Sequence, residues 1–351
     1  MHVLPPYRRI LLLTEGQLGA FTSKTAAALL RYRATDVVGV LDSHAAGTDV
    51  RTVFPWSPPM PIVADIAAAR ALAPDALFVG IAPPGGALPG PMRQHIADAL
   101  AAGMDVVSGL HQFLADDAQL AALAQQNEAR IFDLRRPPAE RTIATGRALS
   151  TSCRRVLTVG TDGNVGKMVA ALELTAAARQ RGLRAEFLAT GQTGTMIAGR
   201  GVAIDAVVSD FAPGAVEELV LSAADSDICI IEGQGSIAHP GFSAVTLALL
   251  HGACPDAMIL VHHAGRTHYS AAPHMRIPRL AELRAIYESA ASLLHPSRVV
   301  GVALNPLGCD PKLVREETRL LAQELRIPVC DAICGCTALL DAVLANTIPL
   351  C

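Results

Sequence analysis

Short apolar runs alternate with helical patterns along the first half of the chain. The apolar runs, each a predicted strand, occupy residues 9–13, 37–42, 76–80, 105–108 and 129–133. Because parallel strands are joined by long crossovers that are usually helices, this alternation predicts βαβ units and a parallel sheet. We therefore expect an α/β, Rossmann-like domain of about five strands. The first strand is not followed by G-x-G-x-x-G, so the pattern does not indicate a dinucleotide cofactor.

The second half repeats this order of strands and helices. Its predicted strands occupy residues 156–159, 185–189, 227–232, 257–261, 299–304 and 327–330. Between the halves, the stretch Arg135-Arg136-Pro137-Pro138 interrupts the pattern, since paired prolines cannot continue a central strand or a helix interior. The sequence thus predicts a Rossmann-like domain over residues 1–137, a linker over residues 138–154, and a second, doubly wound domain over residues 155–351.

A glycine-rich stretch lies between the strand at 156–159 and a long helical pattern. A strand, a glycine-rich turn, a Gly-Lys pair and a helix, in this order, are typical of a phosphate-binding loop. Backbone N–H groups and the positive end of the helix would hold an anion, to which Lys167 adds a charge. The residues predicted to bind the cofactor are Gly160, Thr161, Asp162, Gly163, Asn164, Val165, Gly166, Lys167 and Met168.

This loop departs from the usual P-loop pattern in two ways. Its spacing is G-x5-GK rather than G-x4-GK, and Met168 occupies the position whose Ser or Thr hydroxyl usually binds Mg²⁺. The sequence therefore predicts a P-loop NTPase-like second domain, but favours phosphate binding over NTP hydrolysis. A plain strand-to-helix turn is the structural alternative.

Two further strand ends carry polar residues. The stretch from Thr190 to Thr195 (TGQTGT) is expected to be a substrate or phosphate loop that presents Gln192, Thr193 and Gly194, or else a purely structural turn. The strand at 227–232 ends in Glu232, followed by Gln234 and Ser236. A carboxylate at this position could hold Mg²⁺ or act as a general base on an amine, unless it simply faces solvent.

Composition narrows the classes of partner. The net charge is −3 with no basic block, which argues against nucleic acid. No apolar run approaches the roughly 20 residues of a spanning helix, and the start of the chain lacks a signal-peptide pattern, so we expect a cytoplasmic protein with a small-molecule ligand. Alanine-rich helices favour a homo-oligomer.

The cysteines and histidines do not predict a metal site. Eight cysteines without an export signal indicate reduced thiols. The C-x3-C-x-C spacing of Cys330, Cys334 and Cys336 lacks a matching second pair. The adjacent His262 and His263 end a strand, where consecutive side chains point to opposite faces. We expect Arg266, in the loop that follows, to reach an anionic substrate.

The glycine-rich loop and Glu232 resemble motifs of known enzymes. The loop is similar to the GTDxxVGK loop of dethiobiotin synthetase, and Glu232-Gly233-Gln234-Gly235 is similar to that enzyme's EGAGG segment. A longer resemblance, over nearly the whole chain, is to a two-domain P-loop family that includes bacterial D-glutamate N-acetyltransferases. The residues that carry it are Lys24-Thr25, Gly109-Leu110-His111, residues 133–138, 160–168 and 190–194, and residues 232–236 with His239-Pro240.

The longer resemblance implies acetyl transfer from acetyl-CoA to the amine of D-glutamate or a related acidic amino acid. Met168 belongs to this family's pattern, and the phosphates of CoA would suit a loop without a magnesium ligand. From their placement, Glu232, His239 and Lys167 are expected to carry the chemistry, with Glu232 or His239 as the base and Lys167 on a phosphate. The expected substrate-binding residues are Gln192, Thr193, Gly194, Gln234, Ser236 and Arg266.

Two alternatives to acetyl transfer stay open. The likeness to dethiobiotin synthetase implies an ATP-dependent enzyme, dependent on Mg²⁺, that phosphorylates a carboxylate before an amine attacks it. The third possibility is a nucleotide- or CoA-sensing binding protein without an activity of its own.

Overall fold

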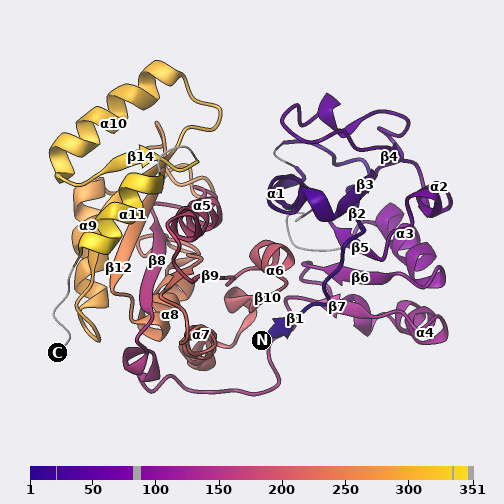
Figure 1. Cartoon of the computed structure of the whole chain (residues 1–351), viewed down its shortest axis with the longest axis horizontal. Coiled ribbons are helices and arrows are strands. Elements are labelled where there is room, and N and C mark those ends of the chain that lie inside the picture. Colours follow the sequence, from indigo (N-terminus) through magenta and orange to yellow (C-terminus); the bar gives the residue numbers. More distant parts are fainter. Residues whose placement is uncertain (21, 82–87, 334–335, 347–351) are drawn as a thin grey trace. The chain divides into compact units, whose positions relative to one another are not determined.

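The computed structural model describes residues 1–20, 22–81, 88–333 and 336–346. The chain divides into two compact units, which are described separately (Figure 1). The N-terminal unit comprises His2–Pro137 together with Gln192–Ala206, and the C-terminal unit comprises Pro138–Gly191 together with Val207–Cys351. None of the helices in the described ranges is long and apolar enough to cross a membrane.

The N-terminal unit is built on a six-stranded parallel sheet of order β4-β3-β2-β5-β6-β7. Its strands are β2 (Ile10–Leu13), β3 (Val37–Leu41), β4 (Ile62–Val63), β5 (Ala76–Val79), β6 (Asp105–Ser108) and β7 (Ile131–Asp133). Its crossover helices are α1 (Lys24–Tyr32), α2 (Ile66–Ala69), α3 (Gly90–Ala101) and α4 (Ala118–Gln126). The Rossmann-like prediction is confirmed, and the short edge strand β4 is an addition to it.

Both faces of this sheet are covered. Leu11 and Leu13 of β2 pack into a core with Met92 of α3, whereas Ile10 and Leu12 pack into a second core with Leu29 of α1. Alternate side chains of a strand point to opposite faces, so a strand covered on both sides is apolar at every position. This explains why β2 is a continuous apolar run in the sequence.

The segment after Gly191 belongs to the N-terminal unit. It forms α6 (Gln192–Ala198) and β10 (Arg200–Gly201), which pairs antiparallel with β1 (His2–Val3). The turn predicted at 190–195 is therefore wrong from Gln192 onward. Met196 of α6 is fully buried in the core that contains α1, and burial of this side chain stabilises the helix where the glycines alone suggest a turn.

The C-terminal unit contains a second six-stranded parallel sheet, of order β14-β13-β12-β8-β11-β9. Its strands are β8 (Arg154–Gly160), β9 (Ala185–Leu188), β11 (Ile228–Ile231), β12 (Ala257–His263), β13 (Arg298–Asn305) and β14 (Val329–Asp331). Its helices are α5 (Lys167–Gln180), α7 (Ala212–Leu221), α8 (Ser243–Ala253), α9 (Leu280–Ala291), α10 (Pro311–Leu325) and α11 (Cys336–Ala345). The doubly wound domain is confirmed.

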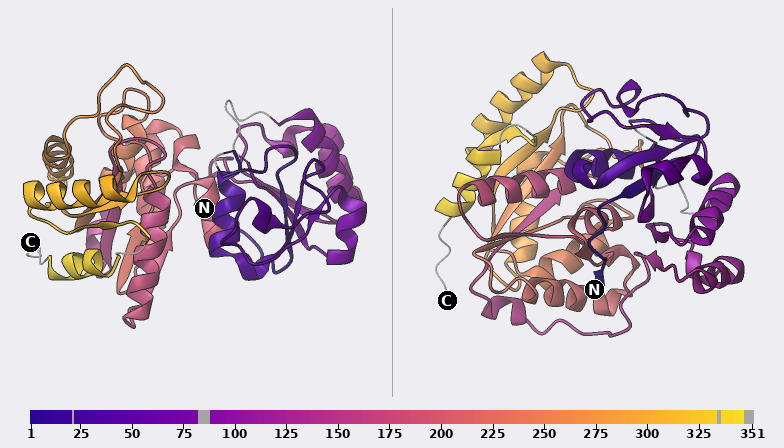
Figure 2. Two further views of the ribbon diagram at one scale, coloured as in Figure 1. Left: turned by 90° about the horizontal axis from the view of Figure 1, so that it is seen from above. Right: turned by 45° about the vertical axis from the view of Figure 1, so that its right-hand side comes forward.

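Helices cover both faces of this sheet as well. Figure 2 shows α5 and α11 on one side of the sheet and α9 on the other. From β8 the chain passes to β9 at one edge of the sheet and returns to β11 between them, and it then crosses to the opposite side of β8 to form β12, β13 and β14. The direction of winding therefore reverses between β8 and β12. In open α/β sheets, ligands bind beyond the carboxyl ends of the strands at such a reversal.

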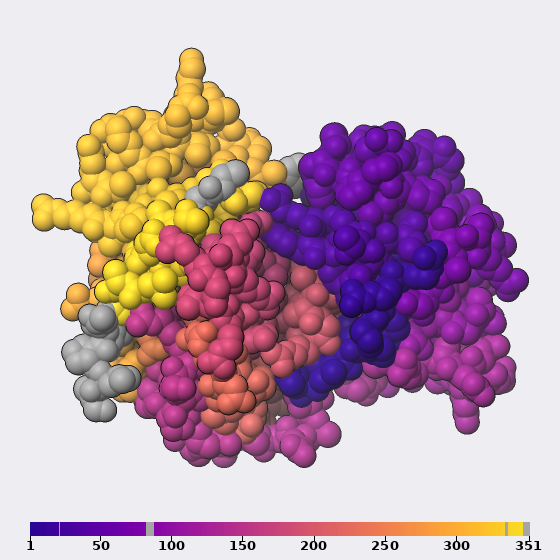
Figure 3. Space-filling view, viewed as in Figure 1, coloured from indigo at the N-terminus to yellow at the C-terminus, as the bar shows by residue number. Residues whose placement is uncertain are grey.

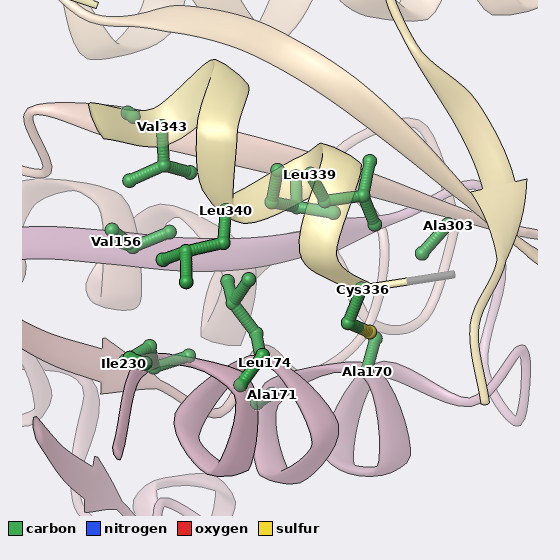
Figure 4. Close-up of a cluster of buried hydrophobic side chains, with 14 of the residues drawn as sticks. Val156, Ala170, Ala171, Leu174, Ile230, Ala303, Cys336, Leu339, Leu340 and Val343 are labelled. Atoms are coloured by element: carbon green, nitrogen blue, oxygen red, sulfur yellow. The ribbon is translucent and has the colours of Figure 1, made fainter. Parts of the chain in front are cut away.

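The core between α5, α11 and the sheet gives a direct test of this packing. Leu340 of α11 is fully buried against Leu174 of α5 and Val156 of β8 (Figure 4). We predict that Leu340→Ala lowers the free energy of unfolding by about 2–5 kcal/mol, because it removes buried methyl groups and leaves a cavity. Leu344→Ala, on the exposed side of the same helix, is the control and should cost under about 1 kcal/mol. Equal losses in urea unfolding would contradict the packing.

Candidate phosphate-binding site

The glycine-rich loop lies where the winding of the C-terminal sheet reverses. It follows β8, and its last residues begin α5 at Lys167. The backbone turns through two left-handed positions, at Asn164 (φ +53°) and at Gly166 (φ +104°), the second of which only glycine adopts readily. A glycine-rich turn of this kind before a helix N-terminus can direct backbone N–H groups toward an anion, so the loop is a candidate anion cradle.

Side chains of other strands and helices hold the loop from outside. Tyr287 of α9 donates its hydroxyl to the Gly160 carbonyl at 2.7 Å, and Asn305 at the end of β13 donates to the Val165 carbonyl at 3.0 Å. Burial raises the pKa of Tyr287 to about 12, so its hydroxyl stays protonated as a donor. These two hydrogen bonds therefore fix the backbone at both ends of the loop.

Asp162 is the most heavily bonded side chain of the loop. Its carboxylate accepts the N–H groups of Gly163 at 2.6 Å and Ser270 at 2.8 Å, and the guanidinium of Arg266 at 3.0 Å. Arg266 also donates to the Gly163 carbonyl at 3.0 Å. Predicted to reach a substrate, Arg266 here neutralises Asp162 and supports the loop.

The ammonium of Lys167 lies inside the loop. The residue is 6% exposed, and Nζ donates to the Asp162 carbonyl at 2.8 Å. A side chain at Gly160 would place its Cβ 2.8 Å from this nitrogen, so glycine is required there. Burial lowers the pKa of Lys167 to about 8, although the charges of Asp162 and Glu232 oppose this shift. The Lys167 ammonium is thus buried away from water and loses its proton near pH 8.

Glu232 arrives beside this cation from the end of β11. Its Oε2 accepts the N–H groups of Thr190 at 3.0 Å and Gly191 at 3.1 Å, just past the end of β9. Gly233 permits this approach, because a Cβ at that position would lie 1.6 Å from the Thr158 carbonyl oxygen. The predicted placement of a carboxylate next to the phosphate loop agrees with this geometry, and the carboxylate is 7% exposed rather than facing solvent.

Gln234 and Ser236 lie in the turn that follows. The Gln234 side-chain amide donates to the Thr190 carbonyl, and the backbone carbonyl of Gln234 accepts from the Thr246 hydroxyl at 2.8 Å. Gln234 thereby ties the turns after β9 and β11 together, while Ser236 is fully buried. Both residues are predicted to bind substrate. In addition, the hydrogen bonds of Gln234 stabilise the two turns that they join.

His239 directs one ring nitrogen toward the loop. Its Nδ1 accepts the N–H of Gly241 at 3.0 Å, so the proton of the neutral ring is on Nε2. The residue is 4% exposed, Phe242 stacks on the ring, and Nε2 lies 3.8 Å from an Asp162 oxygen. Among the described residues Nε2 has no hydrogen-bond partner. Neutral His239 therefore presents a buried donor, not a base, to the loop.

Met168 points into the protein's interior. It is half-buried and packs against the core formed by α5, α11 and the sheet. The position that would carry a magnesium-binding hydroxyl in a P-loop NTPase is therefore occupied by an apolar side chain with a packing role. The side chain of Val165 is likewise fully buried in this core.

The three predicted substrate residues beyond Gly191 belong to the N-terminal unit. The Thr193 hydroxyl is 2.9 Å from that of Thr25, and the Gln192 amide oxygen accepts from Arg135 at 2.9 Å. Gly194 is buried within α6. The grouping of Gln192, Thr193 and Gly194 with Glu232 in one substrate site stays a prediction.

A residue pair that the sequence reasoning missed lies at the first loop position. The Thr161 hydroxyl is 2.8 Å from Nδ1 of His262, the residue considered above only as half of a histidine pair. No local motif marks this contact. The pairing of β8 with β12 would predict the contact, because Thr161 and His262 directly follow the paired residues Gly160 and Val261.

That the cysteines and histidines form no metal site stays a prediction. Cys334 lies outside the described residues. One group in the described ranges, Glu15, Asp42 and His44, brings its ligand atoms within 4.8 Å of one another. Both carboxylates already accept hydrogen bonds from protein groups, Glu15 from Ser43 and Asp42 from Thr14. This group is accounted for as a structural network at the ends of β2 and β3.

Comparison with known families decides the chain's relationship. A model described as the P-loop domain of DUF1611, a domain of unknown function, matches residues 142–340. The chain belongs to the DUF1611 family. A second model of this family, described as the DUF1611_N Rossmann-like domain, matches residues 43–137. The two matched ranges meet where the N-terminal and C-terminal units divide after Pro137, although residues 192–206 of the P-loop match lie in the N-terminal unit.

Two relatives and one solved structure are similar to this chain over most of its length. A Pseudoalteromonas sp. protein named D-glutamate N-acetyltransferase is 35% identical over 94% of this chain and 96% of its own length. A protein of the same name from Tritonibacter scottomollicae is 40% identical over 68% of this chain and 71% of its own. The crystal structure of a DUF1611 protein from Anabaena variabilis superposes with a TM-score of 0.91 at 43% identity, covering 97% and 100% of the two chains.

Removal of the Lys167 charge tests the cradle. We predict that Lys167→Met weakens binding of inorganic pyrophosphate by about 1.5–3 kcal/mol, roughly 10- to 150-fold, because a charge-assisted contact is lost. The fold should survive, since methionine fills the buried volume without a charge to desolvate. Lys312→Met, on the exposed first turn of α10, is the matched control. Calorimetry that finds the two variants equal would refute the phosphate-loop assignment.

The lowered pKa of Lys167 predicts a pH dependence of anion binding. Only the protonated amine attracts an anion, so affinity for sulfate should be full below pH 8 and decline above it, toward tenfold per pH unit. Sulfate keeps its charge throughout this range. Titrations from pH 7 to 9 should show the decline in the wild type and not in Lys167→Met. A flat wild-type profile would show that Lys167 does not titrate there.

Proposed function

We propose that this protein is an N-acetyltransferase that moves the acetyl group of acetyl-CoA to the amine of D-glutamate or a related acidic amino acid. The observation that carries the proposal is a phosphate-binding loop whose magnesium-ligand position holds Met168, an apolar side chain that packs against the core. A phosphate site of this kind suits CoA, which brings phosphates without needing a metal. The names of the two relatives support the same activity.

The reaction needs a base for the amine, and we assign Glu232. Its carboxylate is fixed by the N–H groups of Thr190 and Gly191 beside the Lys167 ammonium. The amine would give its proton to Glu232 and attack the thioester carbonyl. The carbon–sulfur bond then breaks, and the departing CoA thiolate takes up a proton. A positioned base typically contributes 10²–10⁴-fold to such a step.

His239 takes a different role from the one its residue type suggests. Since its neutral ring offers Nε2–H toward the loop, we assign it as a hydrogen-bond donor to a phosphate or thioester oxygen. The stacked Phe242 ring holds the imidazole in this orientation. Of the two candidate bases, Glu232 is therefore the one we propose.

The ATP-dependent alternative has its own supporting observation. Glu232 lies at the end of the strand next to the phosphate loop, which is also where a P-loop enzyme carries its magnesium-binding carboxylate.

Two incubations separate acetyl transfer from this alternative. Incubation with acetyl-CoA and D-glutamate should release free thiol, and incubation with ATP and Mg²⁺ should not consume ATP. ATP turnover without thiol release would favour the alternative, while binding of acetyl-CoA with neither reaction would favour a sensor.

Glu232→Gln tests the assigned base. The glutamine oxygen can still accept both N–H groups, so the fold and the dissociation constant for acetyl-CoA should change little. We predict that thiol release falls by about 10²- to 10⁴-fold. Glu218→Gln, at an exposed carboxylate that pairs with Arg147, provides the matched control and should retain full activity. If Glu232→Gln also keeps its activity, Glu232 is not the base.

A further inference from the structure

Three side chains from separate elements form a continuous chain behind the phosphate loop. The hydroxyl of Thr161 is 2.8 Å from Nδ1 of His262, and Nε2 of His262 is 3.3 Å from a carboxylate oxygen of Glu317. Thr161 follows β8, His262 is on β12, and Glu317 is on α10. Neither His262 nor Glu317 belongs to the loop or is needed by the proposed acetyl transfer.

The direction of the hydrogen bonds follows from the chemistry of the three groups. An ionised carboxylate only accepts, so Nε2 of His262 donates to Glu317. In the neutral ring Nδ1 is then an acceptor, and the Thr161 hydroxyl donates to it. Burial would raise the pKa of Glu317, but hydrogen bonds from His262 and from the Gly265 N–H at 2.8 Å outweigh it and lower the pKa. Glu317 is thus an ionised acceptor at neutral pH.

Burial makes this arrangement rigid. Thr161 is 0% exposed and His262 is 3% exposed, so water does not compete for the hydrogen bond between these two side chains. The Thr161 N–H is also bonded, to the Val261 carbonyl at 3.1 Å. Because the Thr161 side chain is completely enclosed, it does not reach a ligand. What it fixes is the backbone at the point where the loop leaves β8.

The carboxylate end of the chain lies on a helix that contributes little to the core. Only Leu321 and Leu325 of α10 are buried, and the helix lies at the surface of the C-terminal unit (Figure 3). Glu317 directs both carboxylate oxygens to the end of β12, one to His262 and one to Gly265. The neighbouring Glu316 instead pairs with Arg319 on the same exposed helix surface.

We propose that His262 and Glu317 are positioning residues that act through the Thr161 hydroxyl to hold the phosphate loop in its anion-binding shape. The proposal rests on the phosphate-binding part of the proposed function and not on acetyl transfer. A loop held in place before the ligand arrives loses less conformational freedom on binding, so release of this hold should weaken binding of any phosphate ligand.

Binding of inorganic pyrophosphate, measured by calorimetry, tests the proposal without reference to the reaction. We expect Thr161→Val to weaken binding about tenfold, since it keeps the side-chain shape and removes the hydroxyl. Thr161→Ser keeps the hydroxyl and should restore near wild-type affinity. Glu317→Gln should weaken binding severalfold, and the matched control Glu316→Gln should not.

A double variant separates positioning from a general loss of structure. If Glu317 acts through Thr161, Glu317→Gln has no further effect on affinity once Thr161 is valine. A merely structural role would make the two losses multiply, and that result overturns the proposal, as does an unaffected Thr161→Val. If Thr161→Val does not fold, Thr161→Ala serves as the background, and far-ultraviolet circular dichroism checks each variant.

Failure of the positioning role and failure of the acetyltransferase proposal give different results. Failure of thiol release together with the expected pyrophosphate pattern would reject acetyl transfer and support the positioning role. A wild-type protein that binds no pyrophosphate would overturn the positioning role, whatever its activity with acetyl-CoA.

Discussion

The burial of one ammonium group, that of Lys167, is the constraint around which the C-terminal unit's site is arranged. Desolvation lowers its pKa to about 8, and the charges of Asp162 and Glu232 limit that shift. Asp162 is itself neutralised by Arg266, and Glu232 by backbone N–H groups of the neighbouring strand end. Asp162 and Glu232 therefore only partly offset the cost of burying the Lys167 ammonium. The negative charge of a bound phosphate would offset it further.

This constraint explains why so many side chains serve the loop rather than the ligand. A buried charge is costly unless polar groups around it are held in position to satisfy it, and a loop of fixed shape keeps those groups in place. Tyr287, Asn305 and Thr161 each fix the loop from a different direction. Arg266 is part of the same support. Its hydrogen bond to Asp162 gives it this supporting role, and its expected contact with a substrate anion stays a prediction.

The sequence predicts those parts of the site that lie close together along the chain. The loop, Lys167 and the carboxylate at the end of β11 follow local rules of strand, glycine and helix, and the structure places them as expected. Two parts need the three-dimensional fold. The segment from Gln192 looks like a turn, because its glycines are visible locally while the distant core that buries Met196 is not. The contacts of His262 with Thr161 and Glu317 join residues more than fifty positions apart, which no spacing rule addresses.

Glu232 connects the chemistry of the site to the path of the chain. The two N–H groups that its carboxylate accepts belong to Thr190 and Gly191, the last residues of the C-terminal unit before the chain passes to the N-terminal unit. Protonation of a base in this position weakens the two hydrogen bonds that it accepts, because bonds to an ionised acceptor are about twice as strong as neutral ones. If Glu232 takes the proton of the amine as proposed, the hydrogen bonds that hold Thr190 and Gly191 just past the end of β9 would therefore weaken in that step.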